Sequence, residues 1–69
     1  MNWDDTIKSL SDGQFVARPH WRESDKLFAI GWGWVSNHTG DIGLRTDSGL
    51  EVYNVTSEDT EADDWHEVP

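Results

Sequence analysis

Five tryptophans occur in a chain of only 69 residues that contains no cysteine. A chain of this length buries only about 60% of its unfolded surface, so a monomer would be marginally stable. Disulfides and thiolate metal sites are excluded by the lack of cysteine. Association with further copies is the remaining source of stability. Each indole can bury on the order of 200 Å², and we expect part of that surface to lie at an interface.

The chain is strongly acidic, with a formal net charge of −9. From Asp47 onward it contains carboxylates but no Lys or Arg, and all five basic residues lie between Lys8 and Arg45. Nonspecific binding to nucleic acid is disfavoured, because too few cations are present to neutralise phosphates. The charge favours solubility, and a mimic of nucleic-acid phosphates is the alternative explanation.

No apolar run approaches the ~20 residues of a membrane helix, so no membrane partner is expected. The N-terminus carries Asp4 and Asp5 and lacks the apolar core of a signal peptide. We therefore expect a cytosolic protein.

Residues 2–12 have the pattern of a short helix. Asn2 is placed to cap it, and Asp4 and Asp5 suit the positive end of the helix dipole. An apolar stripe with spacing i, i+4, i+7 is formed by Trp3, Ile7 and Leu10. Asp12-Gly13 is a plausible end, because glycine accepts positive φ.

The rest of the chain alternates in the manner of strands separated by turns. We predict a single helical turn from Ser57 to Ala62, with Ser57 as its cap. The predicted strands cover residues 14–18, 27–35, 41–45, 50–56 and 64–68. The sequence thus predicts one α+β domain over residues 1–69, in which an N-terminal helix packs on a small antiparallel β-meander and a short helical turn precedes the last strand.

The second predicted strand has an unusual division of side-chain sizes. Large residues alternate with small ones such as Ala29, Gly31 and Gly33. This pattern indicates that a helix, a ligand or a partner approaches the small face closely. The large residues, whose placement in core, pocket or interface stays open, are Phe28, Ile30, Trp32 and Trp34.

Few residues suggest catalysis or metal binding. No serine has the surroundings of a nucleophile elbow, and the three histidines lack the spacing of a ligand pair. The carboxylates of residues 58–64 are typical of a solvated acidic face. We expect no catalytic residue, no metal and no cofactor.

Arg18 and Trp21 are better candidates for a binding site. A guanidinium can bind phosphate oxygens through paired hydrogen bonds, and an indole can stack on a base. The alternative is that Arg18 pairs with a nearby carboxylate and Trp21 belongs to the core. Tyr53 and Trp65, judged singly, are also typical core residues.

Two segments together resemble a known family. In that family the first segment has the pattern Gly-Lys-x-Val-Ala-Arg-x-x-Trp after a short helix, where this chain has Gln14 in place of the Lys. The second segment ends in Ala-x-Asp-Trp behind a basic hairpin. The matching residues are Gly13, Val16, Ala17, Arg18, Trp21, Leu44, Arg45, Thr46, Gly49, Asp59, Ala62, Asp64 and Trp65. By these segments the chain resembles the phage Thoeris anti-defence sponge proteins of the second type. It is a short variant, with Val52-Tyr53 in place of a Pro-Trp pair and a shorter segment between Trp21 and the hairpin.

The resemblance implies a binding protein and not an enzyme. Family members sequester a cyclic nucleotide immune signal, either a cyclic ADP-ribose isomer or a cyclic dinucleotide, without cleaving it. They act in the host bacterial cytoplasm as homotetramers with pockets between protomers. The ligand-binding residues expected on this basis are Arg18, Trp21, Tyr53, Asn54, Thr56 and Asp59. The alternative function is an acidic interaction protein that inhibits a DNA-binding host defence protein by nucleic-acid mimicry.

Overall fold

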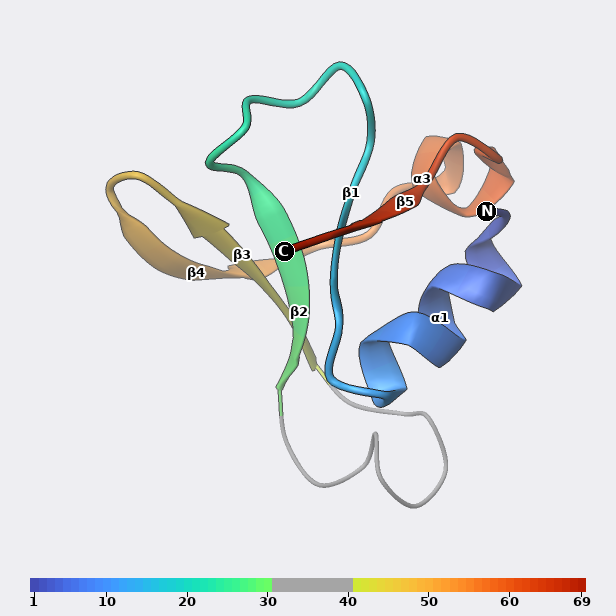
Figure 1. Ribbon diagram of the computed structural model, residues 1–69, viewed down its shortest axis with the longest axis horizontal. Helices are drawn as coiled ribbons and strands as arrows, with labels where there is room; N and C mark the ends of the chain where they lie inside the picture. The colour runs from blue at the N-terminus through green and yellow to red at the C-terminus, as the bar shows by residue number, and fades with distance from the viewer. Residues whose placement is uncertain (31–40) are drawn as a thin grey trace.

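The computed structural model describes residues 1–30 and 41–69 (Figure 1). Its first element is α1 (Trp3–Ser11), which confirms the predicted helix. The side chain of Asn2 caps it by accepting a hydrogen bond of 2.9 Å from the backbone N–H of Asp5. At the other end Gly13 has φ +84°, and its N–H donates to the carbonyl of Leu10 at 3.0 Å. Both ends of the helix therefore satisfy their free backbone groups locally.

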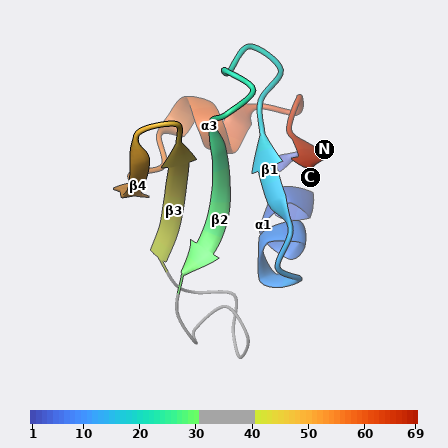
Figure 2. The same cartoon turned by 60° about the vertical axis from the view of Figure 1, so that its left-hand side comes forward.

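Five antiparallel strands form one sheet in the order β4-β3-β2-β1-β5, with α1 on one side of it (Figure 2). The first four strands make the predicted meander, and the last strand returns to pair with β1, so that β1 is an inner strand. The strands are β1 (Phe15–Ala17), β2 (Lys26–Ile30), β3 (Asp41–Thr46), β4 (Gly49–Tyr53) and β5 (His66–Val68).

Several strand ends differ from the prediction for local reasons. β1 stops at Ala17, two residues before Pro19, which has no N–H for the ladder. β4 stops at Tyr53 because Thr56 is used as the N-cap of α3 (Ser57–Glu61), a role that we expected of Ser57. Residues 31–35 of the predicted second strand, with Trp32 and Trp34, lie outside the described residues.

The two faces of the sheet have different surroundings. One face, which we call the helix face, packs on α1 and contains Ala29 of β2. The sequence predicted that a helix, a ligand or a partner approaches the side of this strand that carries its small residues, and at Ala29 that side faces α1. The buried core lies there and consists of Leu10, Val16, Leu27, Ile42 and Trp65. Strand pairing and alternation place another set on the opposite face, which we call the open face: Phe15, Lys26, Phe28, Ile30, Gly43, Arg45, Leu50 and Val52.

Among the described residues, Trp65 is the largest buried side chain, with 1% of its surface exposed. Its indole N–H donates to the carbonyl oxygen of Asp59 at 2.9 Å. The ring centroid of Trp3 lies 5.3 Å from that of Trp65, and the ring centroid of Trp21 lies 5.4 Å from it. Trp65 therefore joins α1, the segment after β1 and the C-terminal segment in one aromatic cluster.

We expect Trp65→Phe to destabilise the protein more than Trp3→Phe, although both replace an indole by a phenyl ring. The first change leaves the buried carbonyl of Asp59 without its donor and removes buried ring surface, which costs about 2–4 kcal/mol. The second removes only partly buried surface, at about 1 kcal/mol. Urea unfolding followed by circular dichroism measures both, and equal losses would show that the hydrogen bond of Trp65 contributes little.

Candidate functional site

Arg18 lies at the end of β1 among three carboxylates that come from the C-terminal part of the chain. Its Nε donates to Asp64 at 2.9 Å, and one terminal nitrogen donates to Glu58 at 3.2 Å. The same nitrogen lies 3.8 Å from a carboxylate oxygen of Asp59. The Arg18 side chain is only 12% exposed. The guanidinium is thus engaged by carboxylates, which is the alternative that the sequence left open for it.

Asp59 is the buried member of this group and fastens α3 to the end of β4. Its carboxylate accepts hydrogen bonds from the Tyr53 hydroxyl at 2.7 Å and from the Thr56 backbone N–H at 3.0 Å. The Thr56 hydroxyl accepts in turn from the Asp59 N–H at 3.2 Å. This reciprocal pair is a capping box, and it satisfies two free donors at the start of α3.

The electrostatics follow from these contacts. Burial by itself would raise the pKa of Asp59, but the hydrogen bonds from Tyr53 and Thr56 and the charge of Arg18 outweigh it and lower that pKa. Burial and the adjacent Asp59 carboxylate raise the pKa of the Tyr53 hydroxyl. The hydrogen bond from Arg18 lowers the pKa of Asp64. Both aspartates are therefore ionised, and Tyr53 is neutral, at physiological pH.

Trp21 lies between this group and the core. Its backbone N–H donates to the carbonyl of Arg18 at 3.1 Å, which closes the turn after β1. Its ring packs edge-on against Trp65, with the centroids 5.4 Å apart, and lies 5.8 Å from the ring of Tyr53. The ring is only partly buried. Trp21 therefore packs on the core and also remains accessible.

Two hollows adjoin Trp21, one on each side of the segment that carries it. The larger, of about 620 Å³, extends from Arg18 and Trp21 towards β5. The smaller, of about 380 Å³, extends towards Leu44 and Tyr53. Trp21, Arg22 and Asp25 line both. Both volumes fall within the range of small-molecule pockets, about 300–1,000 Å³.

The structure brings most of the expected site residues together. Arg18, Trp21, Tyr53 and Asp59 are linked by the contacts described above, and Thr56 joins them through Asp59. Asn54 is an exposed residue just after β4, and no contact joins it to this group in the described part of the chain.

Sequence reasoning gave too little weight to Arg22. It lines both hollows beside Trp21, is exposed, and has no carboxylate partner among the described residues. Its position next to a candidate stacking ring was the available signal. The guanidinium that the sequence singled out instead, Arg18, is the one that carboxylates engage.

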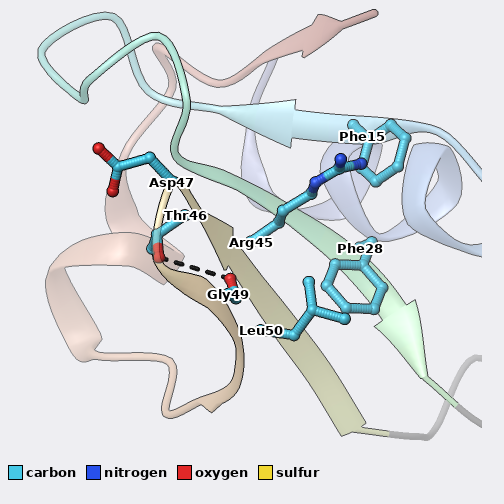
Figure 3. Close-up of a pocket in the computed structure, with 7 residues that line it drawn as sticks. All are labelled: Phe15, Phe28, Arg45, Thr46, Asp47, Gly49 and Leu50. Carbon is cyan, nitrogen blue, oxygen red and sulfur yellow. Dashed lines mark hydrogen bonds between the residues drawn. The ribbon is translucent and has the colours of Figure 1, made fainter.

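A third hollow, of about 490 Å³, lies on the open face (Figure 3). The rings of Phe15 and Phe28 meet edge-to-face, with the centroids 6.2 Å apart, and the Lys26 ammonium lies 4.7 Å from the centroid of Phe15. Arg45 extends towards these rings, and Leu50 lies beside Phe28 (Figure 3). None of its lining residues lines the hollows beside Trp21, although Lys26, which contacts Phe15, lines the larger of those two.

Within residues 1–30 and 41–69, no group of three or more His, Asp or Glu side chains has an arrangement suited to a metal ion. Neither helix of this part of the chain has the length and apolar character needed to cross a membrane.

We expect Asp59→Asn to reduce both the stability of the protein and its sensitivity to acid. A carboxyl group whose pKa is lower in the folded state stabilises the fold above its unfolded pKa of about 3.9, and that contribution is lost as the pH falls through the folded value. The variant should lose about 1–2 kcal/mol at pH 7 and show a shallower decline below about pH 4. Urea unfolding at several pH values measures this. Asp63→Asn, at an exposed residue, is the control, and an equal flattening in the control would contradict the role of Asp59.

No curated protein matches the chain. The family model for the Tad2-like domain, described as a Thoeris anti-defense 2-like domain, matches residues 1–68. That range contains α1, α3, the whole sheet, and every residue that lines the two hollows beside Trp21 except Pro69. The chain therefore belongs to the Thoeris anti-defense 2-like family.

Proposed function

We propose that this protein serves phage anti-defence by binding a cyclic nucleotide immune signal and holding it without cleavage. Membership of the Thoeris anti-defense 2-like family supports the anti-defence role. The observation that carries the binding proposal is the pair of hollows on either side of Trp21, which share Arg22. The protein would act in the host bacterial cytoplasm, where such a signal is made.

The chemistry of these hollows suits a nucleotide. The accessible part of the Trp21 ring offers a stacking surface, which is worth about 1–3 kcal/mol for a base. Arg22 offers paired donors to phosphate, and Lys26 lies along the larger hollow. Tyr53 lines the smaller hollow with Trp21. Trp21 would thus match the flat base of a nucleotide, and Arg22 would match its anionic phosphate.

Arg18, Thr56 and Asp59 would support the ligand in a different way. Arg18 lines the larger hollow, but its donors are directed at Asp64 and Glu58. A phosphate would have to compete with these carboxylates for the guanidinium. We propose that Arg18 and Asp59 mainly hold Trp21 and Tyr53 in position, with Thr56 fixing Asp59, and that exposed Asn54 is free to contact the ligand.

We propose in addition that the active form is a homo-oligomer, most simply a tetramer. The hollows beside Trp21 are open at the surface of a single chain, and a second protomer would enclose a ligand more completely. Self-association also supplies the stability that a chain of 69 residues without cysteine lacks.

The direct test mixes the purified protein with a cyclic ADP-ribose isomer or a cyclic dinucleotide, removes unbound ligand, and heats the complex. We expect thermal stabilisation on binding and release of chemically unchanged ligand, measured by liquid chromatography. Recovery of hydrolysed product would contradict sequestration. Failure to bind any nucleotide, together with capture of a DNA-binding host protein in competition with DNA, would support nucleic-acid mimicry instead.

Arg22→Gln should weaken ligand binding about tenfold or more, because it removes a charge-assisted hydrogen bond without touching the core. It is a sharper test than a change at Trp21, whose ring also packs on Trp65. Lys8→Gln on α1 changes the net charge equally, at a residue that lines neither hollow. Isothermal titration calorimetry compares the two, and equal affinities would show that Arg22 does not contact the ligand.

A further inference from the structure

The two edges of the sheet are protected to very different degrees. The β5 edge is three residues long, carries His66 and Glu67, and is followed by Pro69. The β4 edge is five residues long, has Glu51 as its one charged residue, and contains neither lysine nor proline. Short length, charge and proline are the usual means by which proteins keep an edge strand from pairing with another chain. Within the described part of the chain, β4 is the edge that is open to pairing.

β4 also carries the exposed large apolar side chains. Leu50 is 68% exposed and Val52 is 62% exposed. They alternate with Glu51 and therefore project together from the open face. Beside them lies the hollow of Phe15 and Phe28, and Leu50 lines it (Figure 3). An apolar strip thus runs directly along an unpaired strand edge.

We propose that β4 is the surface on which a second copy of this chain docks, by antiparallel pairing of β4 with β4 across a two-fold axis. This inference rests on the proposed function only in so far as that function calls for self-association. A two-fold contact requires a surface that is complementary to itself, and an antiparallel strand edge meets that requirement through its own N–H and C=O groups.

Charge selects the register of this pairing. If one β4 strand slipped by a single residue along the other, side chains from opposite faces of the sheet would be paired. The registers that keep Leu50 and Val52 of both copies on one apolar face therefore differ from each other in steps of two residues. The register centred on Glu51 sets two carboxylates directly opposite each other, which is unfavourable. The register centred on Leu50 places Val52 opposite Ser48 in the turn. The register centred on Val52 pairs the two valines and sets Glu51 opposite Tyr53 of the second copy.

This register has a consequence for the candidate site. Tyr53 is on the helix face, where its ring lies 5.8 Å from Trp21. Glu51 of the second copy would then stand at the side of Tyr53, at the border of the smaller hollow. The second copy would thereby contribute a residue next to the nucleotide site, and the docking surface and the site would be continuous.

The absence of cysteine from the natural chain allows a direct test. Single cysteines at residues 50, 51 and 52 can form a disulfide-linked dimer efficiently only where the residue faces its own copy, because directly opposed strand residues have the Cα separation that a disulfide needs. With oxidised glutathione, we expect Val52→Cys to cross-link at least tenfold faster than Glu51→Cys, Leu50→Cys and the control Gln14→Cys on an exposed loop. Fastest cross-linking at residue 51 or 50 would overturn the Val52 register, and rates no faster than the control would overturn edge pairing.

A second measurement uses charge to block the edge. Leu50→Lys and Val52→Lys replace exposed side chains, so the fold should persist, as circular dichroism would show. In sedimentation without ligand, we expect the wild type to have at least twice the 7.9 kDa chain mass. Both lysine variants should have half the wild-type mass or less. Gln14→Lys adds the same charge elsewhere and should leave the mass unchanged. Lysine variants that keep the wild-type mass, or a wild type that is monomeric, would overturn the proposal.

These outcomes separate the docking surface from the ligand. A protein that assembles through β4 but binds no nucleotide contradicts the proposed function and leaves the docking surface supported. A protein that binds nucleotide but assembles unchanged with Lys at residues 50 and 52 contradicts the docking surface alone.

Discussion

The hydrogen bond from the indole of Trp65 to the carbonyl of Asp59 is the contact on which the rest of the structure depends. It is buried, so the carbonyl has no water to replace a lost donor, and an unsatisfied group there would cost more than the bond contributes. Trp3 packs on the same ring from α1 and Trp21 packs on it from the segment after β1. One side chain near the C-terminus thus sets the position of the helix and of the candidate site together.

Several carboxylates in the acidic C-terminal part of the chain make structural contacts, in addition to any effect of their charge on solubility. Glu58, Asp59 and Asp64 all form ion pairs with Arg18. The Asp59 carboxylate also accepts hydrogen bonds from the Tyr53 hydroxyl and the Thr56 backbone N–H. Because the carboxylates come from α3 and the segment after it, these contacts hold both against β1. These carboxylates would repel an anionic ligand, but part of their charge is neutralised by Arg18, and their contacts hold together the surface around Trp21.

The sequence predicted elements well where the signals were local. Asn2 and the apolar stripe of α1 lie within a few turns of one another, and each strand of the meander alternates visibly. It left the outcome open for Arg18 and misplaced the cap of α3, and both outcomes depend on which residues pair with each other. Arg18 could be recognised as a cation beside a ring, but its partner Asp64 lies 46 residues away. Thr56, and not Ser57, caps α3, because its hydroxyl accepts a hydrogen bond from the Asp59 N–H while the Asp59 carboxylate accepts one from the Thr56 N–H. A list of hydroxyl-bearing residues does not reveal this reciprocal pair.

A chain of this charge can hold an anion only with cations that the fold has not already used. The Arg18 side chain is only 12% exposed and is engaged by carboxylates, whereas Arg22 is exposed beside Trp21. Exposed charges are screened over about 8 Å at physiological salt. In the proposed function, Arg22 would therefore act on a phosphate at close range, while the effect of the carboxylates farther away would be weakened. Affinity must then come mainly from stacking on Trp21 and from enclosure, since a charge-assisted hydrogen bond is strong only where water is excluded. The docking surface that we propose on β4 ends beside Tyr53, so a second copy would supply that enclosure. For this reason we expect assembly and ligand binding to depend on one another in a protein of this size.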